Sequence, residues 1–346
     1  MLLCELTLEY RHYHKGFNTP IFGVKEQQKE KSNSKKNGQS HEYGPSSVFP
    51  FRSRIIEKNK KDNVRIWIAS ASHAEHITLP QEEIFPNKIC DFWVGGCEVL
   101  NGSKAGMSIP GNIDLLNKYV KLYRPDFSVL YQMSLIIEYQ QGALLNNIAE
   151  KAIENRNSIF DISHIKAFLQ TTSAYQHLSD YIGGNLKLEG FLKNRLPKTY
   201  DSDFELQIMS FLETSKQNGV QPVLTTFAAS HDTSNLSDMP LSIRTNFVRY
   251  NSYLSPLGWV TMIKHYNDLV REIASREGAF LIDIESEMNG KSWLFVDFVH
   301  FNPEGHRLLA IFLAQKLQVF ASRSNTVNEI KEDSYEFSSN LESGDN

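Results

Sequence analysis

Short apolar segments alternate with longer amphipathic ones through the middle of the chain. Three of the longer segments, 112–123, 204–219 and 262–278, repeat their apolar residues at helical spacing, and the last two end at a glycine. Five short segments are rich in branched or aromatic residues and bounded by polar or turn residues, which is typical of strands buried on both faces of a parallel sheet. They are "VRIWIAS" (64–70), "EVLNGS" (98–103), "FSVLYQ" (127–132), "QPVLTTFA" (221–228) and "AFLIDI" (279–284). Strands that alternate with helices predict an α/β protein with a right-handed, doubly wound parallel sheet.

The pattern also predicts three parts of the chain. Residues 1–62 are polar over their second half and predict a partly disordered N-terminal extension. Residues 63–322 form the α/β domain, with a helical insertion at about 138–200 because the third and fourth strands are farther apart than a crossover requires. Residues 323–346 are polar and acidic and predict a flexible tail.

Composition narrows the class of protein. Apolar residues make up 41% of the chain and charged residues 22%, as in a soluble globular protein. A net charge of −4 gives no general attraction to nucleic acid, and we expect no nucleic-acid partner. No apolar run reaches the roughly 20 residues that span a bilayer. The literal chain therefore predicts a cytoplasmic protein, or one of the cell envelope if an N-terminal anchor is missing from this start. Oligomeric state is left open.

The three cysteines give a separate expectation. Cys4, Cys90 and Cys97 are too few for a disulfide framework and their spacing fits no zinc motif, so we expect all three to be reduced.

Polar residues follow the predicted strands, at the edge where ligands bind in open α/β sheets. In chain order they are Ser70, Ser72 and His73, then Asn101, Gly102 and Gly106, then Gln132 and Ser134, then His231 and Asp232, and finally Asp297 and His300. A hydroxyl, a base, an acid that orients the base and backbone N–H donors are the parts of nucleophilic acyl transfer.

Each of these residues also has an ordinary structural interpretation. A serine after a strand, such as Ser72, or an aspartate before a helix, such as Asp297, is often an N-cap. Gly106 alone indicates a left-handed turn. His306 falls inside a predicted helix and is expected to pack or lie on the surface, and a structural role is expected for Asp283. Four aromatic residues could line a pocket: Trp93, Tyr131, Trp259 and Trp293. Most of them are expected in the core.

Taken together, these segments resemble the SGNH (GDSL-type) hydrolase superfamily over roughly residues 64–320. "VDFVHFNPEGHRLLA" (296–310) resembles the family's D-x-x-H block, and "RIWIASASHAEHITLPQEEIFP" (65–86) and "EVLNGSKAGMS" (98–108) resemble its first two blocks. The resemblance implies a flavodoxin-like, three-layer α/β/α fold with a five-stranded parallel sheet of order 2-1-3-4-5. It also implies a catalytic triad of Ser72, His300 and Asp297.

The resemblance assigns the oxyanion hole to Ser72, Gly106 and, in the third block, Ser134. Two positions depart from the family pattern: "SAS" replaces the usual glycine-containing motif, and Ser134 or Leu135 stands where the family has an oxyanion asparagine. The predicted activity is a serine esterase for carbohydrate or small acyl esters, with no metal or organic cofactor. The alternatives are an O-acyltransferase and a catalytically impaired binding module.

Overall fold

A computed structural model describes residues 52–54, 56, 59–60, 63–133, 136, 138–140, 143, 193–251 and 253–342. The chain divides into two compact units. The sheet unit comprises residues 41–135, 201–230 and 263–346, and the second unit comprises residues 1–40, 136–200 and 231–262. The domain boundaries expected from the sequence stay predictions.

The sheet unit is built on five parallel strands in the order β2-β1-β3-β4-β5. This confirms the predicted flavodoxin-like α/β fold and strand order. All five strands begin within one residue of the predicted starts, and each ends one to three residues earlier than predicted. Their bounds are β1 (Val64–Ala69), β2 (Cys97–Asn101), β3 (Phe127–Leu130), β4 (Gln221–Thr225) and β5 (Phe280–Ile282).

Burial on both faces explains the continuous apolar strands. In β1 every residue from Arg65 to Ala69 is buried, and Trp67 has no exposed surface. A strand covered on both sides has no solvent face, so its sequence shows an apolar run and not an alternation. The β1 segment therefore belongs at the centre of the sheet, between β2 and β3.

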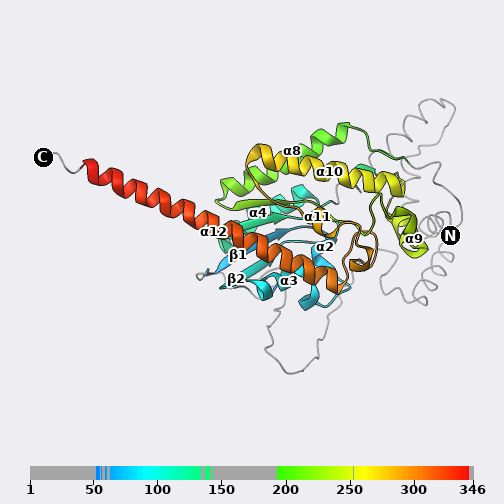
Figure 1. Ribbon diagram of the computed structural model, residues 1–346, viewed down its shortest axis with the longest axis horizontal. Helices are drawn as coiled ribbons and strands as arrows, with labels where there is room; N and C mark the ends of the chain where they lie inside the picture. The colour runs from blue at the N-terminus through cyan, green and yellow to red at the C-terminus, as the bar shows by residue number, and fades with distance from the viewer. Residues whose placement is uncertain are drawn as a thin grey trace, which may run out of the picture. The chain divides into compact units, whose positions relative to one another are not determined.

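Helices cover both faces of the sheet (Figure 1). On one face α4 (Ile109–Tyr123) is joined to the end of α8 (Thr199–Gln217) by a hydrogen bond from Asn218 to Asn117, and Phe204 of α8 packs on Tyr266 of α10 (Pro256–Glu277). On the other face α12 (Pro303–Glu342) packs against α3 (Phe85–Lys88) and β5. The result is the expected three-layer arrangement.

Several short elements have no counterpart in the apolar pattern. They are α2 (Ser72–Glu75), α11 (Ile284–Met288) and the 3-10 turns η1 (Gln81–Glu83), η2 (Ile89–Phe92) and η5 (Ser292–Leu294). One turn of helix is too short to display a helical period, so such elements escape detection from the sequence. The helix predicted at 262–278 begins earlier, at Pro256, a residue favoured at the first helical position.

The second unit contains α9 (Leu241–Tyr250), the 3-10 turn η4 (Leu236–Asp238) and the first residues of α10. A buried amide organises its described part: Gln140 donates to Asn251 at 2.6 Å and accepts from the backbone N–H of Leu254 at 2.9 Å. Most of the predicted insertion at 138–200 lies outside the described residues, as does most of the N-terminal extension.

The expectation of three reduced cysteines is wrong for two of them. Cys90 and Cys97 form a disulfide, with Cα atoms 5.4 Å apart. The chain turns back through Gly95 and Gly96 before β2, which brings η2 beside the start of that strand. Two cysteines seven residues apart do not reveal such a turn, and Cys4 lies outside the described residues.

At the C-terminus, α12 continues to Glu342, through most of the segment for which a flexible tail is predicted. The tail's flexibility stays a prediction. Within the described residues, no helix combines the length and the apolar character that crossing a lipid bilayer demands.

Candidate active site

Ser72 lies just after the end of β1, at the carboxyl edge of the sheet, and the strand order reverses beside β1. The preceding Ser70 is fully buried, and its hydroxyl donates to the carbonyl of Tyr131. Asn101, at the end of β2, donates to the carbonyl of Ala74 in α2 at 3.0 Å. The turn that carries Ser72 is therefore tied to both neighbouring strands.

The loop at 290–302, which follows β5 and α11, runs along the same edge of the sheet and carries Asp297 and His300 to Ser72. Gly290 N–H donates to the carbonyl of Ala229, just beyond β4, at 2.9 Å, and Ser230 N–H donates to the carbonyl of Phe298 at 3.1 Å. Asn302 then caps α12 by accepting from the N–H of Gly305 at 2.9 Å. These bonds hold the loop at 290–302 across the end of the sheet.

Asp297, His300 and Ser72 form a continuous hydrogen-bonded line. His300 Nδ1 lies 2.7 Å from Asp297 Oδ2, and His300 Nε2 lies 2.8 Å from Ser72 Oγ. An ionised carboxylate only accepts, so Nδ1 carries the proton and Nε2 accepts from the serine hydroxyl. The aspartate and histidine side chains are 16% and 23% exposed, and Ser72 is half-buried, so each member of the line keeps some solvent-exposed surface.

Asp297 is held in its ionised form. Burial alone would raise its pKa, but the hydrogen bond and charge of His300 and the backbone N–H groups of His300 and Val299 hold the pKa below its usual range. Those N–H groups donate to Oδ1 at 2.7 and 2.8 Å. One carboxylate oxygen thus fixes the turn while the other orients the imidazole.

Two further histidines, His73 and His76, lie against His300, and a third, His306, lies beside His76; no sequence pattern predicts this cluster. The rings of His73 and His76 lie nearly parallel to that of His300, at 5.2 and 5.5 Å between centroids. His306, on α12, is fully buried beside His76, so it has the packing position that was one of the two expected for it. Burial lowers the pKa of His73 and of His306 well below the ordinary value, so both rings are neutral near pH 7.

The loop after β2 carries Gly106, which has a φ of +72° and is exposed. Two buried amides shape this loop: Gln132 donates to the carbonyl of Met107 and accepts from Asn112, and Asn112 also donates to the carbonyl of Ser70 at 3.1 Å. A helical asparagine such as Asn112 carries no distinctive sequence signal, so the pattern does not predict this role. Ser134 lies outside the described residues, so the predicted oxyanion roles of Gly106 and Ser134 stay predictions.

Other residues from the predicted strand ends have local partners. Asp232 accepts from the N–H and hydroxyl of Ser234 in a turn of the second unit. Asp283 accepts from Arg271 and caps α11, in line with the structural role expected for it. Tyr131 is buried in the core, whereas Trp293 is 61% exposed on the loop that carries Asp297 and His300.

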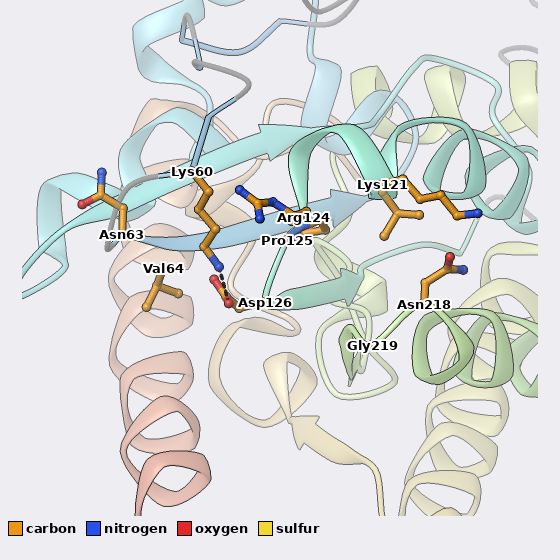
Figure 2. A pocket seen from close by; sticks show the side chains of 10 residues that line it. Lys60, Asn63, Val64, Lys121, Arg124, Pro125, Asp126, Asn218 and Gly219 are labelled. Carbon is orange, nitrogen blue, oxygen red and sulfur yellow. Dashed lines mark hydrogen bonds and ion pairs between the residues drawn. The ribbon is translucent and has the colours of Figure 1, made fainter. Parts of the chain in front are cut away.

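A hollow of about 930 Å³ lies at the amino edge of the sheet, away from the triad (Figure 2). Lys60 pairs there with Asp126, while Lys121 and Arg124 stand at the C-terminal end of α4. Cations at that end complement the helix dipole, which accounts for them without a ligand. Among the described residues, no group of three or more His, Cys, Asp or Glu side chains is arranged to hold a metal ion.

Comparison of the sequence with known protein families finds no matching family, and no curated protein matches. Solved structures with a similar fold include a GDSL-like lipase from Bacteroides thetaiotaomicron, with 12% identity, coverage of 76% of this chain and 92% of that chain, and a TM-score of 0.44. An acetyl xylan esterase from Geobacillus stearothermophilus has 12% identity, coverage of 75% and 96%, and a TM-score of 0.42. A lipase/acylhydrolase from Enterococcus faecalis has 13% identity, coverage of 73% and 95%, and a TM-score of 0.39.

Proposed function

We propose that this protein is a serine hydrolase of ester bonds that works through an acyl-enzyme at Ser72. The observation that carries the proposal is the line from Asp297 through His300 to Ser72, with contacts of 2.7 and 2.8 Å. The three side chains come from two loops 228 residues apart in the sequence, which meet at one edge of the sheet. If Ser72 and Asp297 were only helix N-caps, no imidazole would be needed to connect their side chains.

The chemistry follows from the hydrogen-bond directions. His300 Nε2 takes the hydroxyl proton as Ser72 Oγ attacks the ester carbonyl carbon. The imidazolium that forms is stabilised by the Asp297 carboxylate. His300 then gives the proton to the departing alkoxide oxygen, and an acyl group remains on Ser72. In the second half, His300 takes a proton from water as the resulting hydroxide attacks the acyl carbon, and the proton returns to Ser72 Oγ as the carboxylic acid leaves.

The substrate class we propose is a carbohydrate ester or another ester with a small acyl group such as acetate. Ser72 and His300 are half-buried and keep some solvent-exposed surface, which suits attack on a small acyl group. The backbone N–H groups of Ser72 and Gly106 are the proposed oxyanion donors, with Ser134 as the third. Removing one such donor typically costs on the order of 10²–10³ in rate.

Hydrolysis of p-nitrophenyl acetate by the parent and by Ser72→Ala tests the proposal. We expect the variant to lose at least about 10³-fold in kcat, because the nucleophile is gone. Ser286→Ala, which changes an exposed serine on α11, is the matched control and should keep the parent rate. Equal rates for the parent and Ser72→Ala would refute the proposal. Acetate release with and without a saccharide acceptor separates hydrolysis from acyl transfer.

A further inference from the structure

His76 has a backbone conformation that histidine does not favour. It follows the single turn of α2 with φ 33° and ψ 68°, and its N–H closes the turn on the carbonyl of Ser72 at 2.8 Å. This left-handed position is usually filled by glycine or asparagine, because a larger side chain strains the backbone there. Arg124 is the other left-handed residue, apart from glycines, within the described ranges. A strained backbone held at a candidate active site calls for a reason in the side chain.

The side chain of His76 lies against the proposed catalytic base. Its ring is tilted by only 20° from the ring of His300, at 5.5 Å between centroids. On α12, His306 Nδ1 accepts from the backbone N–H of Phe85 at 3.1 Å, so the proton of His306 is on Nε2. That N–H points to His76 Nδ1 at 3.4 Å. His306 therefore supports the ring of His76 from a helix that is itself fixed to α3.

Arg52 fixes the strained turn through its guanidinium. One terminal nitrogen donates to the carbonyls of Glu75 and His76 at 2.8 and 2.7 Å, and the other donates to the carbonyl of Leu79 at 2.6 Å. Three carbonyls bound by one planar group leave the turn little freedom. The backbone and the ring of His76 are thus each held by a separate partner.

We propose that His76 is a positioning residue for His300: its ring, supported by His306 and by the turn that Arg52 holds, keeps the imidazole of His300 in the plane that joins Ser72 and Asp297. The role rests on the proposed esterase function. His73 adds a second nearly parallel ring at 5.2 Å. A residue needed only to close the turn would be better served by asparagine or glycine.

The charge state of His76 suits this role. The charged or titratable groups around it are His73, His300, His306, Asp297 and Arg52. Burial first, and then the charges of His300 and Arg52, lower the pKa of His76 to about 4, against the opposing effect of Asp297. The ring is therefore neutral near pH 7 and does not repel His300 when that imidazole becomes protonated.

Two substitutions at His76 separate the ring from the turn. His76→Asn suits the left-handed backbone and keeps an acceptor for His306, but it removes the ring. We expect an equal or higher urea midpoint, with kcat lower by about 10- to 100-fold and KM unchanged, because a displaced base reacts slowly. His76→Phe keeps a ring, strains the turn and leaves the His306 N–H unpaired. We expect it to have a lower midpoint yet a higher kcat than His76→Asn.

Arg124→Asn is the control, because it also places an asparagine at a left-handed residue, but at the opposite edge of the sheet. Its kcat should equal that of the parent. A parent-like kcat for His76→Asn would overturn the positioning role. So would a lower urea midpoint for His76→Asn together with a kcat for His76→Phe that is no higher than that of His76→Asn.

A readout that needs no turnover distinguishes this inference from the proposed function. In the full chain with labelled histidine, the Nδ1 proton of His300 should give a downfield nuclear magnetic resonance signal that exchanges slowly with water. We expect that exchange to be faster in His76→Asn and unchanged in Arg124→Asn. A parent with the slow signal but no esterase activity would overturn the proposed function alone. Unchanged exchange in His76→Asn would overturn the positioning role and leave the esterase proposal standing.

Discussion

Asp297 uses both of its carboxylate oxygens, and this explains why the acid and the base lie three residues apart. Oδ1 accepts from the N–H groups of Val299 and His300, while Oδ2 faces the imidazole of His300. The same carboxylate therefore closes the turn and orients the ring that the turn carries. With a longer spacing, the two functions would need separate groups.

Asp297→Asn tests this double use. The amide can still accept at Oδ1, but it presents an N–H where His300 needs an acceptor, which favours the wrong tautomer of the imidazole. We expect kcat for p-nitrophenyl acetate to fall by about 10³–10⁴-fold with little change in folding. Asp268→Asn, at an exposed carboxylate of α10, should leave the rate as it is. A parent-like kcat for Asp297→Asn would mean that Asp297 only closes the turn.

At the scale of elements, the start of α12 places the loop at 290–302. Asn302 caps the helix, Pro303 opens it, and Gly305 lies where no side chain fits. A Cβ on Gly305 would sit 2.3 Å from the carbonyl oxygen of Leu294 and 2.7 Å from the ring of Phe301. The glycine of "NPEGH" therefore lets the first turn of α12 lie directly on the loop that carries Asp297 and His300.

Gly305→Ala should accordingly disturb both stability and activity. We expect the free energy of unfolding to fall by about 1–3 kcal/mol, since the clash is with backbone and cannot relax by a side-chain rotation. Gly111→Ala in α4 is the control: its Cβ would meet only the side chains of Met107 and Ser108, and alanine favours a helix. Urea unfolding measures both variants. Equal stability of the parent and Gly305→Ala would show that a side chain fits between position 305 and the carbonyl of Leu294.

The histidines on α2 and α12 make stability depend on pH. In the folded chain the pKa values of His73 and His306 lie well below 6.5, and that of His76 is about 4. Below about pH 6.5 the unfolded chain binds protons at these histidines and the folded chain does not, so acid favours unfolding. The free energy of unfolding should fall between about pH 6.5 and 4, with a slope of up to about 1.4 kcal/mol per pH unit for each histidine.

His306→Gln should reduce that slope, because it removes one of the three groups. Urea unfolding of both proteins across this range measures the difference. The lowered pKa of Asp297 adds a further loss only at lower pH, as that carboxylate becomes protonated. A parent whose unfolding free energy is constant from pH 6.5 to 4 would contradict the burial of these imidazoles in neutral form.

At the scale of the whole molecule, apolar runs and the strand-end rule predict the sheet and the meeting of distant loops. The five strands and their order follow from the pattern and the family resemblance, and Ser72, Asp297 and His300 stand at strand or loop ends where that rule places ligand sites. The supporting groups could not be predicted in this way. Arg52, His76 and His306 act through contacts across long sequence separations, which no periodicity records.

The disulfide and the short helices could not be predicted from the sequence, for a related reason. Cys90 and Cys97 meet because the chain reverses at two glycines, and α2 has a single turn, so neither leaves a pattern of several residues. Features that do not repeat along the sequence can be recognised only from the folded structure.

Labelling with a fluorophosphonate, followed by peptide mass analysis, tests whether His300 activates Ser72 as a nucleophile. We expect one adduct, on Ser72, in the parent protein, and its near absence when His300→Ala removes the base that activates the hydroxyl. No adduct in the folded parent, or an adduct on a different serine with Ser72 unmodified, would contradict it.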